Sequence, residues 1–395
     1  MDTIKRVKLS EIAILITKGT TPTTLGYSFQ DDGVNFLKIE CFAENGEFIK
    51  EKVSYISDEC HEKLKRSQLK NGDILFSIAG AIGRVAVVTE EMLPANTNQA
   101  LAIVRINSED IYLPYIKLIL TSPIIKAQFE RKKQGVAQLN ISLKDINDLE
   151  IPLPEKSMQI EYATLFENVS NIITARQQEL QKLDELVKAR FVEMCGDMVL
   201  NPNHWERVPL GKVCDVRDGT HDSPQYCAEG YPLVTSKNVT GGHIDMSGCN
   251  LICKEDYDKI NERSKVDYGD ILMPMIGTVG KPVVVDIVAD FAIKNVALIK
   301  FHNDSLVNNI FVKTLLESDY FDRTVISKIR GGTQKFISLG DIRGLEICLP
   351  PMASQNEFSK FVKQIDKSKF VVQQALDKAQ TLFDSLMQKY FINKL

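Results

Sequence analysis

The chain lacks an apolar segment long enough to cross a bilayer. No uninterrupted apolar run among its 395 residues approaches the length of roughly 20 residues that a membrane-spanning helix needs. The first residues, Met1 to Arg6, carry some positive charge, but no apolar signal region follows them. We therefore expect a cytoplasmic protein with no membrane partner.

Cysteines are present, but not in the patterns that bind metal or form a disulfide framework. The eight cysteines are scattered, and none belongs to a Cys-x-x-Cys pair. Cys249 and Cys253 have no His or Cys partners at zinc-site spacing. We therefore expect reduced thiols and no metal site.

Catalytic motifs are also missing. The chain has no phosphate-binding loop of the Walker type, no His-Glu-x-x-His and no Gly-x-Ser-x-Gly, and its five histidines are dispersed. Asn201-Pro-Asn-His204 is only superficially similar to the Asn-Pro-Pro-Tyr signature of amino-methyltransferases, since it lacks the second proline and the aromatic residue. These absences predict a chain without catalytic residues, and a free-standing enzyme is the less favoured alternative.

Excess positive charge is lacking as well. The net charge is −4 and the pI is about 5.9, which argues against general coating of nucleic acid but permits a localised basic surface. Basic clusters occur at residues 63–66 with Lys70, at 131–133 and at 328–330. A charge run is usually a solvated face, so these clusters alone do not indicate a phosphate site.

What the chain does have is an internal repeat. Gly72-Asp-Ile-Leu75 returns 197 positions later as Gly269-Asp-Ile-Leu272, and both copies continue into Gly-x-x-Gly followed by a basic residue. Two further stretches echo each other: residues 97–102 match 294–299 at the same offset, and residues 141–146 match 337–342 at an offset of 196. A period near half the chain indicates two copies of a domain.

Each half reads as a mixed α and β domain. Short β-rich runs with Gly and Pro turns occur at residues 34–39, 73–76, 85–88 and 101–104. One helical stretch is predicted at residues 113–132, with a counterpart at 307–329. The pattern predicts an α+β fold with two homologous domains, each with its own core.

Two long helices are predicted, one after each domain. Apolar residues recur every seven positions in both segments, which is typical of helices packed along a seam. In the first segment they are Phe166, Ile173, Leu180, Val187 and Met194, with Val169 and Leu183 in a second series broken by Arg176 and Arg190. In the tail they are Val362, Leu376, Phe383 and Tyr390, with Ile365, Val372, Ala379 and Leu386, and Lys369 is the break.

The starts of these helices are less alike. Ser354-x-x-Glu357 reads as a capping box that fixes the start of the second helix, whereas the first has only Pro154 and Glu155 at its start. The predicted domains are residues 1–153 and 203–350, with a central spacer helix at 154–196 and a C-terminal one at 351–395.

The simplest closed arrangement is an antiparallel coiled coil of the two helices. It would place the globular halves at opposite ends about a pseudo-twofold axis. Forty helical residues span about 60 Å.

Polar loops with glycines offer candidate contacts in both halves. Gly80-Ala-Ile-Gly83 precedes Arg84, and Gly277-Thr-Val-Gly280 precedes Lys281. A basic residue after glycines could meet a phosphate, but a plain hairpin turn explains the glycines equally well. Loops 134–140 and 330–335 carry side chains that can pair with base edges, although such residues are common in loops anyway.

Taken together, these features resemble a specificity (S) subunit of a Type I restriction-modification system. The resemblance covers essentially the whole chain, including the half-openings at 7–12 and 205–213 and the Leu-Glu-Ile-x-Leu-Pro that closes each half. Pro350-Pro351 followed by Gln355 fits the family's Pro-Pro-x-x-x-Gln pattern. The first copy departs from it, with Pro154-Glu155 before Gln159.

The resemblance implies a sequence-specific DNA-binding subunit that reads a bipartite duplex target, one half-site per target recognition domain. The helices would act as a ruler and would dock two modification (M) subunits, and restriction (R) subunits can join. The chain would need no cofactor of its own, because S-adenosylmethionine binds the M subunits, while ATP and Mg serve the R subunit.

The residues we expect to contact DNA are loop positions of suitable chemistry. In the first half they are Lys18, Thr20, Thr21, Lys38, Arg84, Gln134, Gln138 and Asn140. In the second half they are Thr220, His221, Lys237, Lys281, Arg330, Thr333, Gln334 and Lys335. The main alternative is a coiled-coil scaffold that carries two diverged protein- or ligand-binding domains, which the mild acidity favours slightly.

Overall fold

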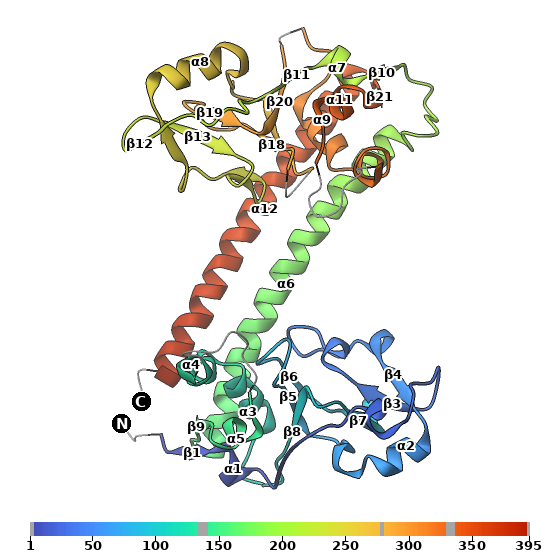
Figure 1. Ribbon diagram of the computed structural model, residues 1–395, viewed down its shortest axis with the longest axis vertical. Helices are drawn as coiled ribbons and strands as arrows, with labels where there is room; N and C mark the ends of the chain where they lie inside the picture. Colours follow the sequence, from blue (N-terminus) through green and yellow to red (C-terminus); the bar gives the residue numbers. More distant parts are fainter. Residues whose placement is uncertain (1–3, 133–140, 277–279, 303, 329–335, 393–395) are drawn as a thin grey trace. The chain divides into compact units, whose positions relative to one another are not determined.

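The computed structural model describes residues 4–132, 141–276, 280–302, 304–328 and 336–392 (Figure 1). The chain divides into two compact units. Unit 1 comprises Met1–Arg176 and Ala375–Leu395, and unit 2 comprises Gln177–Gln374. Each unit has its own buried apolar clusters. The prediction of an α+β fold with two related domains and long helices is confirmed.

Unit 1 is built on two small sheets. The first is antiparallel, in the order β2-β8-β5-β6, with β2 at Leu15–Lys18, β8 at Leu101–Arg105, β5 at Ile74–Ser77 and β6 at Val85–Val87. The second has the order β4-β3-β7, with β4 at Ser54–Ile56, β3 at Val34–Leu37 and β7 at Ala95–Thr97, and β3 runs parallel to β7. A separate pair joins β1 (Arg6–Lys8) to β9 (Glu150–Pro152).

Unit 2 repeats the strand order of unit 1 and adds one edge strand to the second sheet (Figure 1). Its antiparallel sheet has the order β11-β20-β17-β18, at Asp215–Asp218, Val296–Lys300, Ile271–Pro274 and Val283–Val284. Its second sheet is β12-β16-β13-β19, at Tyr226–Cys227, Asn250–Ile252, Tyr231–Thr235 and Ala292–Lys294, and β13 runs parallel to β19. The pair β10 (Arg207–Pro209) with β21 (Glu346–Cys348) matches β1 with β9, and a hairpin of β14 (Val239–Thr240) and β15 (His243–Ile244) is added.

The helical stretches predicted at 113–132 and 307–329 are each interrupted. The first is α3 (Leu113–Leu120) followed by α4 (Pro123–Lys132), and the second is α9 (Asn309–Leu316), α10 (Asp319–Thr324) and the 3₁₀ turn Ile326–Lys328. Pro123 has no N–H with which to continue α3, and Ser318 is the N-cap residue of α10.

The remaining helices are short. They are α1 (Leu9–Ile12), α2 (Asp58–Lys63), α5 (Leu143–Asn147), α7 (Leu210–Val213), α8 (Lys254–Ser264) and α11 (Leu339–Arg343). The 3₁₀ turns lie at Pro22–Leu25, Ile39–Cys41, Lys50–Lys52, Lys65–Ser67 and Glu90–Met92. The described helices include none with the length and apolarity that a membrane crossing needs.

The two long helices are α6 (Lys156–Cys195) and α12 (Met352–Met387), the latter continued by a π-helical turn at Gln388–Ile392. In unit 1 the ring centroids of Tyr162 and Tyr390 lie 4.7 Å apart, and those of Phe166 and Phe383 lie 5.2 Å apart. Because the second residue number falls as the first rises, the helical segments of this unit run antiparallel.

The same holds within unit 2. There Arg190 pairs with Glu357 over 2.8 Å, and Asp184 pairs with Lys369. Two of the residues that break the seven-residue pattern, Arg190 and Lys369, are thus used in ion pairs between the helices. The apolar positions of the pattern are buried or half-buried, which confirms that it marks the packed faces.

The capping box predicted at Ser354 does not form the start of α12. The helix begins at Met352, so Ser354 lies in the first turn, and the Pro351 carbonyl accepts the N–H of Gln355 over 3.1 Å. The helix therefore begins directly after the proline pair, where the fixed φ of Pro351 is compatible with a helix start.

The repeated Gly-Asp-Ile-Leu motif has a structural role. Asp73 accepts the N–H of Lys70 over 2.8 Å and pairs with Arg105 on β8 over 2.7 Å. In unit 2, Asp270 accepts the N–H of Asp267 over 2.8 Å and pairs with Lys300 on β20 over 2.7 Å. Each buried carboxylate thereby fixes the turn before one strand to the end of its neighbour.

These pairs also correct the expected register of the repeat. Lys300 occupies the place of Arg105, an offset of 195 rather than 197, because β5 pairs Ile74 with Val104 while β17 pairs Ile271 with Ile299. The turn before β8 contains residues 98–100, whereas Asn295 alone separates β19 from β20. The apparent match of 97–102 with 294–299 therefore does not continue in register past the asparagine.

Candidate nucleic-acid interface

A loop leaves the first strand of the antiparallel sheet at the same place in both units. In unit 1 the N–H of Thr20 donates to the Thr97 carbonyl over 3.1 Å, and in unit 2 the N–H of Thr220 donates to the Ile293 carbonyl over 3.0 Å. The preceding glycines, Gly19 and Gly219, are required by this close approach. A Cβ would lie 1.9 Å from the Thr97 oxygen in the first case and 2.2 Å from the Ile293 oxygen in the second.

In unit 1 this loop carries three of the predicted residues. Lys18 is exposed at the end of β2, while Thr20 and Thr21 are half-buried. The Thr21 hydroxyl donates to the side-chain oxygen of Gln99, which lies in the turn before β8. The loop is therefore held against that turn by both main-chain and side-chain bonds.

Lys38 and Arg84 are bound into unit 1. The Lys38 ammonium donates to the Ser54 hydroxyl over 3.1 Å and lies 4.3 Å from the centroid of the Phe29 ring. Arg84 donates to the Phe42 carbonyl over 2.9 Å. Gly80 and Gly83, with φ of 74° and 86°, form the turn between the antiparallel strands β5 and β6, so the hairpin interpretation of this motif is correct.

In unit 2 the corresponding loop centres on a buried carboxylate. Nε2 of His221 donates to Asp218 Oδ2 over 2.8 Å, and Nδ1 lies 2.8 Å from Asn295 Oδ1. Arg263, at the end of α8, pairs with the other oxygen of Asp218. Lys294 donates to the Ser223 hydroxyl over 3.0 Å, which holds the far side of the loop.

The other predicted residues of unit 2 differ in setting. Thr220 is half-buried, and its hydroxyl accepts the N–H of Asp222 over 3.1 Å. Lys237 and Lys281 are exposed. Gln134, Gln138, Asn140, Arg330, Thr333, Gln334 and Lys335 lie outside the described residues, as do residues 277–279 of the second Gly-x-x-Gly.

The ends of the two segments that carry those residues are firmly placed. The N–H of Ile141 donates to the Ile78 carbonyl over 3.1 Å, and the N–H of Ile337 donates to the Met275 carbonyl over 3.0 Å. Ser142 and Ser338 then cap α5 and α11 as members of capping boxes. The repeated Ile-Ser-Leu motif is thus a helix start that follows each polar segment.

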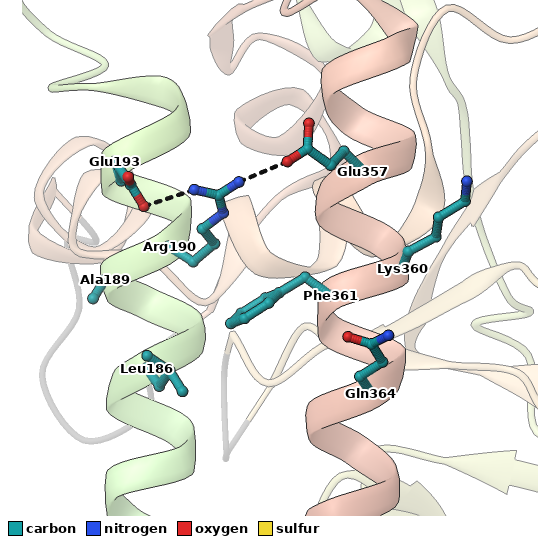
Figure 2. Close-up of a pocket in the computed structure, with 8 residues that line it drawn as sticks. All are labelled: Leu186, Ala189, Arg190, Glu193, Glu357, Lys360, Phe361 and Gln364. Carbon is teal, nitrogen blue, oxygen red and sulfur yellow. Dashed lines mark hydrogen bonds and ion pairs between the residues drawn. The ribbon is translucent and has the colours of Figure 1, made fainter.

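A groove lies between α6 and α12 within unit 2 (Figure 2). Figure 2 shows Arg190 between Glu193 and Glu357, and Phe361 pointing from α12 toward α6. Leu186 is 46% exposed at the groove, which is a large fraction for a leucine. Within the described parts of the chain, no group of three or more His, Cys, Asp or Glu side chains could hold a metal ion.

The family model described as the Type I restriction modification DNA specificity domain matches residues 1–185 and again residues 202–378. The chain belongs to this family. It carries the specificity domain twice, in agreement with the repeated topology of the two units.

Individual relatives are similar over different shares of the chain. The Type I restriction enzyme EcoBI specificity subunit of Escherichia coli is 33% identical over 132 residues, which are 33% of this chain and 27% of that protein. The MjaVIII specificity subunit of Methanocaldococcus jannaschii is 24% identical over 277 residues, which are 65% of this chain and 64% of the relative. The matches thus span less than two thirds of either relative.

Two solved structures share the fold. A chain from a structure of the type I R-M system has a TM-score of 0.59 at 18% identity, with 99% of this chain and 98% of that chain covered. The S subunit of the Type-I restriction-modification system from M. genitalium has a TM-score of 0.55 at 13% identity, with 98% and 95% covered.

The second specificity domain contains interface candidates that sequence reasoning missed, namely Asp218, Arg263 and Lys294. The repeat held a usable signal for two of them. Asp218 stands 200 positions after Lys18, so the charge at this site is reversed between the domains. Arg263 stands 197 positions after Arg66 within a stretch of constant offset.

Proposed function

We propose that this chain is the sequence-specific DNA-binding subunit of a Type I restriction-modification complex, with one half-site of a bipartite duplex target read by each specificity domain. The observation that carries this proposal is that the specificity domain occurs twice, with the same strand order but with different residues in the loops. Lys18 and Thr21 in unit 1 are replaced by Asp218 and His221 in unit 2, while the strands that hold them correspond. Two such domains have the same shape but different hydrogen-bonding chemistry.

Exposed cations in loops of both domains support contact with DNA. Lys18, Lys237 and Lys281 are exposed, and an ammonium near the backbone of a duplex neutralises phosphate charge whatever the base sequence. The bases would be read by polar loop side chains, among them Gln334. We expect Gln334→Ala to weaken binding by about 1–3 kcal/mol only on sites with the correct second half.

The chemistry would belong to partner subunits. In this proposal two M subunits with bound S-adenosylmethionine methylate adenines at the target, and R subunits add ATP- and Mg-dependent cleavage. The groove of Leu186, Arg190, Glu357 and Phe361 supports a docking role for the long helices, because it combines an exposed apolar side chain with charges of both signs.

The decisive experiment maps methylated adenines across a genome in cells with and without this chain. The proposal requires methylation at one bipartite sequence that disappears when the chain is removed. A gel-shift on random duplex in the presence of the M subunits tests the scaffold alternative. A scaffold would show no salt-sensitive DNA binding, whereas a specificity subunit loses affinity steeply as salt rises.

Docking is tested separately by charge reversal. Arg190→Glu should weaken assembly with the M subunits, and adding Glu357→Arg should restore it if only the internal pair matters. A weakened complex in both variants would instead show that the partner contacts these charges directly. Exposed Lys188 on α6, changed to Glu, is the matched control, since it does not line the groove.

A further inference from the structure

We propose that Arg263 reads a guanine in the half-site of the second specificity domain, with Asp218 and His221 as its positioning residues. This inference rests on the proposed function and deepens it, because it names one base pair of the target and the side chain that recognises it.

Asp218 is buried, although both of its partners are exposed. Its side chain is only 8% exposed, at the end of β11, whereas its partners His221 and Arg263 are 60% and 67% exposed. A buried carboxylate is unfavourable unless it is paired and hydrogen-bonded. One buried carboxylate, that of Asp218, therefore holds two exposed side chains, His221 and Arg263.

His221 is held from both sides. Its two ring nitrogens face Asp218 and Asn295, each over 2.8 Å. Asn295 has a positive φ of 55° and is the single residue between β19 and β20, so the short turn of this domain places the amide there. Since both ring nitrogens face groups of the protein, His221 is better suited to hold the carboxylate than to pair with a base.

Arg263 has more N–H donors than its pairing with Asp218 uses. A guanidinium carries five N–H groups in a rigid fork, and Asp218 binds one terminal nitrogen. The main chain at Arg263 is also fixed, because its carbonyl accepts from Arg217 over 2.8 Å. Arginine paired with O6 and N7 of guanine is the commonest base-specific contact in the major groove, and it depends on the orientation of the fork.

The surroundings of Arg263 are polar and open to solvent. Arg263 lines a cleft together with Thr220, Ser223, Asp256 and Lys259, between the β11–β12 loop and α8. The hydroxyls of Thr220 and Ser223 can meet base edges, and Lys259 can meet a phosphate. The carboxylates of Asp222 and Asp256 in the same lining favour base edges over phosphate. The cleft thus provides a place where a base edge can meet Arg263.

The first specificity domain lacks the cluster of Asp218, His221 and Arg263. Arg66 takes the place of Arg263, but Lys18 stands where Asp218 would be, and Thr21 stands where His221 would be. An ammonium cannot accept a hydrogen bond from a guanidinium and repels it. The inference therefore concerns the second half-site alone, and the first half-site serves as an internal control.

The test uses the complete chain assembled with its M subunits and a panel of duplexes in which every base pair of both half-sites is varied singly. We expect Arg263→Ala to lose discrimination on the order of 10- to 100-fold at one G·C pair of the second half-site. Arg263→Lys should keep affinity but lose that discrimination, because an ammonium has no fork. Asp218→Asn should lose it at the same base pair, and Arg323→Ala, on the exposed face of α10, should not.

Three results would overturn the inference. They are a uniform loss of affinity on all sequences in Arg263→Ala, unchanged discrimination in that variant, or a second half-site without a G·C pair. Unaltered reading of the first half-site and an unchanged unfolding temperature establish that a variant is folded. If the unaltered complex itself showed no sequence preference, the proposed function would fail, and that result is distinct from the three above.

Discussion

Gln355 joins the start of α12 to Asn308, whose main-chain N–H donates to Gln355 Oε1 over 2.8 Å. The amide nitrogen of Gln355 donates to the carbonyls of Pro350 and Leu306, over 2.8 and 3.1 Å. In unit 1, Gln159 makes the same three bonds, to the N–H of Tyr112 and to the carbonyls of Pro154 and Asp110. The glutamine that marks the family pattern is thus a buried link between each long helix and the segment that enters α3 or α9.

Replacing this link should be costly. Gln355 is 0% exposed, so Gln355→Leu leaves buried main-chain groups unpaired, at about 1–3 kcal/mol for each such group. We expect a loss of about 3 kcal/mol or more in the free energy of unfolding, measured by urea denaturation. The control is Gln178→Leu on the exposed surface of α6. Equal stability of the two variants would contradict a structural role for Gln355.

The buried ion pair of unit 2 predicts a second large effect. Lys300 is 9% exposed and bonds to Asp270, which is 4% exposed, over 2.7 Å. Lys300→Met would leave the carboxylate buried without its charge partner, which typically costs about 3–5 kcal/mol. The pair of Lys313 with Glu317 is the control, because its side chains are 29% and 40% exposed and Lys313→Met should cost about 1 kcal/mol or less.

This destabilisation should depend on pH. Burial already raises the pKa of Asp270 above its ordinary value, although Lys300 opposes that shift. A carboxyl whose folded-state pKa is raised binds its proton more tightly when folded, so its contribution to stability is present at low pH and is lost as pH rises. Removing Lys300 increases the shift. Lys300→Met should therefore cost less at pH 5 than at pH 8, and a pH-independent cost would be inconsistent with this account.

The repeat explains why so much of the fold could be predicted. Gly72 and Gly269 lie in the same turn before β5 and β17, and the predicted β-rich runs at 34–39 and 85–88 contain the strands β3 and β6. The two-residue shift at β8 and β20 could not be seen, because Ala297-Leu298 matches Ala100-Leu101 on one alignment and the similar pair Ala102-Ile103 on the other. Register is decided by strand pairing, which a single sequence does not display.

The candidate interface was harder to predict for a related reason. Asp218 and Arg263 are 45 residues apart in the chain and meet only because the ends of β11 and α8 come together in the folded unit, so no local pattern could pair them. No local pattern indicates that Arg84 donates to the Phe42 carbonyl, 42 residues away. Residue type indicates what a side chain can bind, whereas its partner depends on the tertiary structure.

Gly219 offers a test of how the loop after β11 is held. In Gly219→Ala the new Cβ would lie 2.2 Å from the Ile293 carbonyl oxygen, so the loop or the end of β19 must move. We expect a loss of about 1–3 kcal/mol in the free energy of unfolding and weaker discrimination at the second half-site alone. Gly248→Ala is the matched control, because its Cβ would meet nothing within 4 Å. Similar behaviour of the two variants would show that the close approach is unimportant.

The cysteines should divide into reactive and protected thiols. Cys227 is exposed, Cys249 and Cys253 are half-buried, and Cys41, Cys60, Cys195, Cys214 and Cys348 are buried. Burial raises the pKa of Cys195 and of Cys214 to about 12, so both stay as unreactive thiols at pH 8. With a maleimide at pH 8 and mass spectrometry of the peptides, Cys227 should react first and the buried five only after denaturation. Rapid labelling of Cys214 in the native protein would show that unit 2 opens far more readily than its packing implies.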